Sequence, residues 1–322
     1  MLEVERVAVT YDKGGRSVPL TGPVSFSIGE GEIFGLVGES GSGKSMTALA
    51  LMRLLPRHAQ LTGRTVLDGT DLAALPERGM RALRGSRISM IFQEPVTALN
   101  PVFKLEAQLV AAIRAHGGAS RADARKRAVE LLRMVGIPDP ETRLSYYPHQ
   151  LSGGMCQRVM IGMALAAGAR FLIADEPTTA LDVTIQEQIL QLIERLSRET
   201  GLSVLFISHD LGVVARLCDR VAVMYAGEIV ETGEADALLR APLHPYTKGL
   251  LRCAPDLSEI GVVQRGIPGT PPPAGAWPSG CRFRARCAFA LPLCSEPQAL
   301  ADHGDDHQVR CWRAAELAGQ VH

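Results

Sequence analysis

The chain has 322 residues, of which 46% are hydrophobic, and its mean hydropathy of +0.09 is typical of globular proteins with a substantial core. Its 34 basic and 34 acidic residues balance, and it has no polybasic tract, which disfavours nucleic acid as a main partner. No apolar run reaches about 18 residues and no signal-peptide pattern begins the chain, so we expect a cytosolic protein without a membrane span.

The first predicted elements form a strand, a glycine-rich loop and a helix. Strands are predicted at 4–10 and 32–37, and a helical pattern follows at 44–54. The loop between them, 38–45, reads Gly-Glu-Ser-Gly-Ser-Gly-Lys-Ser, a complete phosphate-loop pattern. Its backbone amides would face the phosphates, Lys44 would reach the β- and γ-phosphates, and Ser45 would bind Mg²⁺. The predicted nucleotide-binding residues of the loop are Gly38, Ser40, Gly41, Ser42, Gly43, Lys44 and Ser45.

A second anion site is predicted further along the chain, after a helical stretch at about 104–135. Ser152, Gly153 and Gly154 precede the helix-like run 155–166, and they would present backbone N–H groups at a helix N-terminus. Two phosphate sites on one polypeptide indicate that two such chains meet head to tail. Each chain would then complete the ATP site of the other.

Acidic residues follow a short apolar strand at 171–174. Asp175 is placed to hold the Mg²⁺ shell, and Glu176 would polarise the attacking water as a general base. An amphipathic helix at 183–198 and a buried strand at 203–207 come next, and His209 follows that strand.

Strands that alternate with helices predict an α/β fold with a mostly parallel sheet. A helical subdomain is expected at about 95–165, and two short strands are expected within 220–231. The segment 265–280 is dominated by Pro and Gly, which favours an extended wrapping segment over a helix. We therefore expect one nucleotide-binding domain at 1–235 and a C-terminal extension at 236–322.

The order of the motifs, 38–45, Gln93, 151–154, 175–176 and His209, resembles the ATP-binding subunits of ABC transporters. The resemblance implies a RecA-like P-loop ATPase core with an antiparallel β subdomain, and two ATP molecules between paired subunits. It also implies roles for single residues, in which Gln93 binds Mg²⁺ and the nucleophilic water and His209 contacts the γ-phosphate. Tyr11 would stack on adenine, and Asp182 would signal across the dimer.

Two further stretches are similar to the oligopeptide/dipeptide branch of bacterial importers. They are the run 90–101 and the run 241–247, which contains His244-Pro245-Tyr246. The resemblance covers about residues 1–300 and implies an ATPase that powers uptake of di- and oligopeptides. Its partners would be a second ATPase, with a heterodimer favoured, two transmembrane permease subunits and an external substrate-binding protein. The chain would then lie peripherally on the cytoplasmic face of the inner membrane. Because the branch also includes importers of nickel and of other small solutes, the cargo stays open.

Cysteines cluster in the last part of the chain, at Cys281, Cys287, Cys294 and Cys311. Four thiolates suit either Zn²⁺ or a [4Fe–4S] cluster, and the absence of a C-x-x-C pair is unusual for a zinc ribbon. Some peptide-importer ATPases that resemble this chain carry such an iron–sulfur cluster, which favours iron–sulfur over zinc or no metal. The cluster would staple a segment that lacks its own core. The three nearby arginines, Arg282, Arg284 and Arg286, would offset its charge, and His303 or His307 could replace a thiolate on zinc.

Other function classes fit the sequence less well. Soluble ABC ATPases of translation or DNA repair usually have two nucleotide domains or a long coiled coil, and neither pattern occurs here. A P-loop kinase or GTPase would lack the 151–154 helix and the His209 motif. An inactive assembly subunit is disfavoured because every predicted catalytic position is intact.

Overall fold

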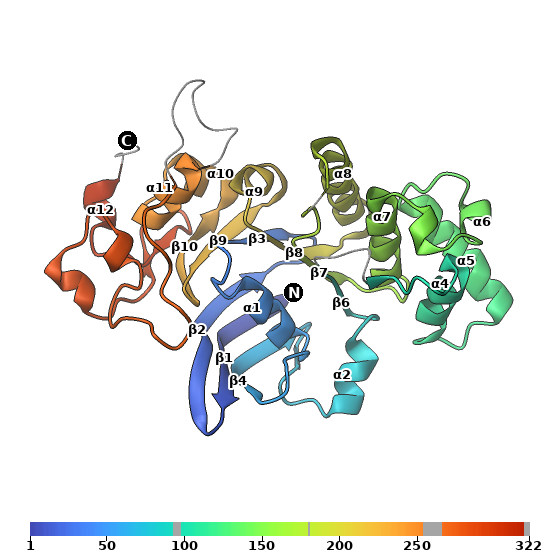
Figure 1. Ribbon diagram of the computed structural model, residues 1–322, viewed down its shortest axis with the longest axis horizontal. Coiled ribbons are helices and arrows are strands. Elements are labelled where there is room, and N and C mark those ends of the chain that lie inside the picture. Colours follow the sequence, from blue (N-terminus) through green and yellow to red (C-terminus); the bar gives the residue numbers. More distant parts are fainter. Residues whose placement is uncertain (93–97, 180, 254–265, 319–322) are drawn as a thin grey trace. The chain divides into compact units, whose positions relative to one another are not determined.

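The computed structural model describes residues 1–92, 98–179, 181–253 and 266–318 (Figure 1). The chain divides into two compact units. Unit 1 comprises Met1–Gly29, Ile33–Ala73 and Phe206–His322, and unit 2 comprises Glu30–Glu32 and Ala74–Leu205. Within the described ranges, no helix is both long and apolar enough to cross a membrane.

An antiparallel sheet forms the N-terminal part of unit 1. Its strands, in the order β2-β1-β4-β5, are β2 (Arg16–Ile28), β1 (Leu2–Lys13), β4 (Ala59–Leu67) and β5 (Thr70–Asp71). Leu2, Val4, Val7 and Val9 of β1 are buried, and the irregularity between Val4 and Val7 shifts the alternation of buried positions from even to odd residue numbers. The expected antiparallel β subdomain is thereby confirmed.

A second sheet of unit 1 contains both parallel and antiparallel pairs. Its strands, in spatial order, are β11 (Ala301–Asp302), β12 (Gln308–Val309), β10 (Glu228–Glu234), β9 (Arg220–Tyr225) and β3 (Ile33–Val37). β3 and β9 pair in parallel, whereas β9, β10, β12 and β11 pair antiparallel to one another. The predicted mostly parallel sheet is therefore corrected to a mixed one. The reason is that the β9–β10 hairpin and two short strands of the C-terminal extension join its edge.

Short helices complete unit 1. They are α1 (Lys44–Leu51), α9 (Leu211–Leu217), α10 (Ala235–Arg240), α11 (Pro245–Arg252), α12 (Ala314–Leu317) and the 3₁₀ turns η3 (Arg284–Arg286) and η4 (Pro292–Ser295). Pro245 stands at the first position of α11, where its missing N–H costs no hydrogen bond. Residues 266–280 form neither helix nor strand, as the Pro- and Gly-rich composition predicts.

Unit 2 combines a parallel strand pair with packed helices. The strands are β6 (Ile88–Ile91) and β7 (Phe171–Asp175), which pair in parallel. The helical elements are α2 (Glu77–Leu83), α4 (Leu105–Arg114), α5 (Arg121–Met134), α6 (Pro140–Arg143), η1 (Pro148–Gln150), α7 (Gly153–Ala164) and α8 (Val183–Thr200). β8 (Ser203–Ser208) is divided by the boundary between the units. The helices predicted within 104–135, 152–166 and 183–198 are thus confirmed.

The amphipathic pattern of α8 explains why one side of this helix is buried. Ile189, Leu192, Ile193 and Leu196 recur at helical spacing and are buried. The helix ends at Gly201, which has a left-handed φ of 67° that favours glycine.

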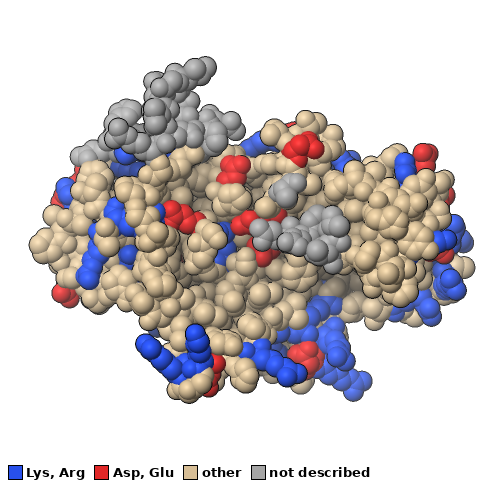
Figure 2. Space-filling view, viewed as in Figure 1, with Lys and Arg blue, Asp and Glu red and all other residues tan. Residues whose placement is uncertain are grey.

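On the face shown in Figure 2, basic and acidic side chains are interspersed among uncharged residues, in keeping with the balanced charge of the chain.

Candidate ATP site and cysteine module

The phosphate loop of unit 1 lies between β3 and α1, as predicted. Gly38, Gly41 and Gly43 have φ values of 154°, 78° and 106°, which side-chain-bearing residues rarely adopt. A Cβ atom at Gly38 would also lie 2.1 Å from the carbonyl oxygen of Met224, so only glycine fits there. The loop is fixed at its far end because the N–H of Gly227 donates to the carbonyl of Ser42 at 2.8 Å.

The side chain of Lys44 is enclosed by this loop. It is only 4% exposed, and its Nζ donates to the carbonyl oxygens of Gly38 at 2.8 Å and of Glu39 at 3.1 Å. A lysine cation at a glycine-rich loop between a strand and a helix is the arrangement that binds nucleotide phosphates.

The other predicted residues of unit 1 lie on different elements. His209 follows β8 and is exposed, and only Asp210 separates it from α9. Asp210 caps α9, because its Oδ1 accepts hydrogen bonds from the N–H groups of Gly212 and Val213. Tyr11 is half-buried in β1, opposite Val18 of β2.

In unit 2, the acidic pair stands at the end of β7 as the sequence predicts. Asp175 is the last residue of the strand and is 6% exposed. Glu176 has a φ of 47°, a left-handed conformation that costs a non-glycine residue on the order of 1–3 kcal/mol. Its Oε2 accepts a hydrogen bond from Thr179 Oγ1 at 2.9 Å. Strain of this kind concentrates at functional sites, which suits a catalytic carboxylate.

The second predicted anion site is the N-terminus of α7. Ser152 caps the helix, since its Oγ accepts a hydrogen bond from the N–H of Met155 at 3.3 Å. A Cβ atom at Gly154 would lie 2.4 Å from Ile185 Cγ2, so this glycine is also needed for the contact between α7 and α8. Asp182 caps α8 by accepting from the N–H of Ile185 at 2.9 Å. The two helix starts therefore lie together in unit 2.

Gln93, a predicted ligand of Mg²⁺, lies outside the described residues. Cys156 of α7 is buried, and burial raises the pKa of its thiol, so it is no activated cysteine.

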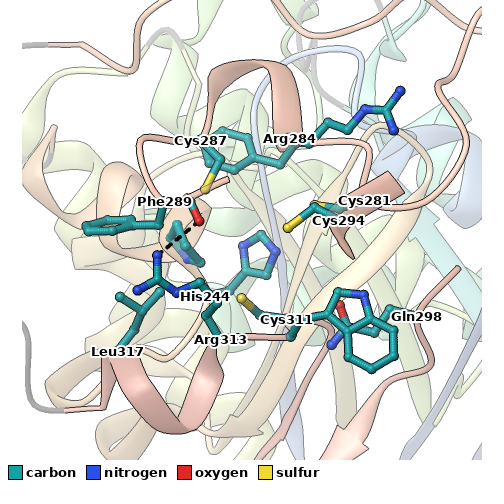
Figure 3. A pocket seen from close by; sticks show the side chains of 13 residues that line it. His244, Cys281, Arg284, Cys287, Phe289, Cys294, Gln298, Cys311, Arg313 and Leu317 are labelled. Atoms are coloured by element: carbon teal, nitrogen blue, oxygen red, sulfur yellow. Dashed lines mark hydrogen bonds between the residues drawn. The ribbon is translucent and has the colours of Figure 1, made fainter. Parts of the chain in front are cut away.

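The C-terminal cysteines Cys281, Cys287, Cys294 and Cys311 line one cavity of about 20 Å³, and we call them the cysteine module (Figure 3). The N–H of Cys281 donates to the carbonyl of Cys294 at 2.9 Å. Burial, reinforced by the neighbouring cysteines, raises the pKa of Cys281 to about 12 and that of Cys311 to about 11. Such thiols stay protonated near neutral pH unless a cation stabilises their thiolates.

The basic residues near the cysteine module only partly match the expectation. Arg284 lines the cavity, but Arg282 pairs with Glu228 at 3.4 Å and Arg286 pairs with Glu39 at 2.6 Å. Two of the three arginines are therefore committed to carboxylates outside the cavity.

The histidines considered as zinc ligands do not line the cavity either. His307 Nε2 pairs with the buried Glu231 at 2.8 Å, and His303 lies outside the cavity lining. In the described parts of the chain, no group of three or more His, Cys, Asp or Glu side chains is placed to hold a metal ion.

Comparison with known proteins identifies the family. The ABC transporter family matches residues 21–179, and the C-terminal region of oligopeptide/dipeptide transporters matches residues 230–294. A putative peptide import ATP-binding protein of Brucella abortus (strain 2308) is 47% identical over 332 residues, which cover 99% of this chain and 98% of the relative. The chain belongs to the ATP-binding subunits of peptide ABC importers.

Two relatives of this peptide-importer ATPase come from Bacillus subtilis (strain 168). The oligopeptide transport ATP-binding protein OppD is 47% identical, in an alignment that covers 97% of this chain and 88% of OppD. The dipeptide transport ATP-binding protein DppD is 48% identical, in an alignment that covers 97% of this chain and 94% of DppD. The chain is thus an ABC-type ATPase that hydrolyses ATP to power peptide import.

A solved structure supports the ABC ATPase fold of this peptide-importer subunit. A dimeric ATP-binding cassette bound to ADP and Pi, in a post-hydrolysis state, superposes with a TM-score of 0.65 at 30% identity. The match covers 73% of this chain and 99% of the cassette. The α/β ABC ATPase fold, with its mixed main sheet and antiparallel β subdomain, is thereby confirmed.

Proposed function

We propose that this subunit hydrolyses ATP in composite sites that it forms with a second ATPase subunit. The observation that supports this is the presence of two anion-binding elements in one chain, the loop 38–45 and the capped N-terminus of α7 at Ser152–Gly154. The solved cassette that it resembles is dimeric. Each site would combine the loop of one subunit with the α7 N-terminus of the other, so closure on ATP would drive the membrane subunits.

We propose for single residues the roles that the resemblance to ABC ATPases implies. Glu176 would accept a proton from the attacking water, and His209 would contact the γ-phosphate and orient that carboxylate. The oxygens of Ser45, Asp175 and Gln93 are hard ligands that suit Mg²⁺, which would neutralise charge on the transferred phosphoryl group. Two further proposed roles belong to Tyr11, which would stack on adenine, and to Asp182, which would carry the signal across the dimer.

The proposed assembly contains more than the ATPases. We infer a nucleotide-binding domain at 1–235, with a helical subdomain at about 95–165, and an extension at 236–322. The partners would be a different second ATPase, two transmembrane permease subunits and an external substrate-binding protein. This chain would lie peripherally on the cytoplasmic face of the membrane. Uptake of labelled peptides by cells that carry or lack this chain tests the function, and nickel uptake by the same cells tests the alternative cargo.

We also propose that the cysteine module binds a [4Fe–4S] cluster. Its thiols surround one cavity and are not paired as disulfides. Four thiolates on one tetrahedral zinc ion would stand roughly 3.8 Å apart, because each Zn–S bond is about 2.3 Å long. An iron–sulfur cluster is larger, so it suits sulfurs that no single ion can reach together. The cluster would cross-link the extension.

Anaerobic purification tests the cluster directly. The wild-type protein should absorb broadly near ~400 nm and contain about four irons per chain. Cys287→Ser should lose most of both signals, whereas Cys253→Ser, outside the cavity, should keep them. A colourless wild-type protein with one zinc per chain, or iron content that Cys287→Ser leaves unchanged, would contradict the proposal.

A further inference from the structure

Glu39, the second residue of the phosphate loop, connects the loop to the C-terminal extension. Its N–H donates to the hydroxyl oxygen of Tyr246 at 2.8 Å. Its two carboxylate oxygens accept from Arg286, at 2.6 Å from Nη1 to Oε2 and 3.0 Å from Nη2 to Oε1. Its carbonyl oxygen accepts from Lys44 Nζ and from the N–H of Ser42, each at 3.1 Å. One residue therefore joins the extension to the phosphate-binding lysine.

The ion pair is well sheltered and has a fixed geometry. The side chain of Arg286 is 5% exposed and that of Glu39 is 26% exposed. Two parallel N–H···O bonds fix orientation as well as distance, and a pair sheltered from water is weakly screened by salt. Arg286 can therefore hold the Glu39 side chain in one position.

Arg286 is itself anchored by several elements of unit 1. Its Nε donates to the carbonyl of Pro268 at 2.9 Å, and its Nη1 donates to Tyr225 Oη at 3.3 Å. The preceding Phe283 is buried and packs against Tyr225 and Tyr246, with ring centroids 5.2 Å and 5.4 Å apart. The turn that carries Arg286 is therefore packed against buried aromatic side chains.

The backbone that carries Arg286 runs between two residues of the cysteine module. The turn η3 lies between Cys281 and Cys287, and it is closed by hydrogen bonds from the N–H of Arg284 to Cys281 and from the N–H of Cys287 to Arg284. The conformation of this turn therefore determines the position of the Arg286 guanidinium group. The cysteine module and the phosphate loop are thus joined through one side chain.

We propose that Arg286 is a positioning residue for ATP binding, which holds Glu39 so that the loop stays closed around Lys44. The inference rests on the proposed phosphate-binding role of residues 38–45. It makes the C-terminal extension a contributor to nucleotide affinity, although Arg286 does not touch the nucleotide. A loop that is ordered before ATP arrives binds ATP more tightly, because less conformational entropy is lost on binding.

A double-mutant cycle tests the proposal in the full-length protein. We expect Arg286→Gln and Glu39→Gln each to raise the KM for ATP about tenfold with a smaller change in kcat, and the double variant to be no worse than either single one. Arg286→Lys, which keeps the charge but loses the paired hydrogen bonds, should restore only part of the affinity. Arg240→Gln, which breaks an exposed pair with Asp236, should leave KM unchanged.

Several results would overturn the proposal. An unchanged KM in folded Arg286→Gln, even with a lowered melting temperature, would make the arginine merely structural. Effects of the two substitutions that multiply in the double variant would show that the residues act separately. The loop itself is tested independently by Lys44→Met: if that change leaves ATP binding intact, the proposed role of 38–45 fails, whatever Arg286 does.

Discussion

Replacing Glu176 with Gln is expected to lower kcat for ATP hydrolysis by about 10²–10⁴-fold, the range for loss of a general base. The amide has nearly the same shape as the carboxylate and can still accept the hydrogen bond from Thr179, so the strained backbone at φ 47° should persist. ATP affinity should stay close to that of the wild type, because the residue acts on water and not on the bound phosphates. Subunits with bound ATP should therefore accumulate.

Steady-state phosphate release and equilibrium ATP binding measure the two halves of this prediction. Glu199→Gln is a matched control, because Glu199 is an exposed carboxylate near the end of α8. Turnover by Glu176→Gln within a few-fold of the wild type would assign the general base elsewhere. Loss of both turnover and binding would instead point to a collapsed site.

The second large effect is expected for Lys44→Met, which should weaken ATP binding and lower kcat/KM by roughly 10²–10³-fold. The methionine fills similar space, but it removes the ammonium group that the loop encloses and that would neutralise the β- and γ-phosphates. Two hydrogen bonds to the loop carbonyls are lost as well, so the loop should also become less ordered.

Calorimetric binding of a non-hydrolysable ATP analogue, together with hydrolysis assays, measures this change. Lys126→Met removes an exposed lysine of α5 and should behave as the wild type. Retained affinity in folded Lys44→Met would show that the phosphates bind elsewhere in the chain.

Short sequence patterns predicted the buried strands and the phosphate loop, because their residues alone determine these elements. The buried strands 171–174 and 203–207 are short apolar runs, and the loop 38–45 follows its own strand, so each could be placed without tertiary information. β2 was missed because Pro19 and Pro23 interrupt its pattern, and prolines argue against a strand. β4 was missed because Gly63 breaks its pattern where the β1–β4 register shifts.

Directions of side chains were the least predictable feature. Arg282 and Arg286 lie next to cysteines in the sequence, yet they pair with Glu228 and Glu39. Glu39 and Arg286 are 247 residues apart, and no local pattern connects them. Their pairing depends on how the extension packs against the loop, which only the folded unit reveals.

Peptide uptake is the most direct test of the central claim that this chain powers peptide import. Cells of the source organism that lack the chain should lose ATP-dependent uptake of labelled di- and oligopeptides. Wild-type protein should restore uptake, and Glu176→Gln, expressed to the same level, should not. Unchanged peptide uptake in cells without the chain, or loss of nickel uptake in its place, would contradict the account.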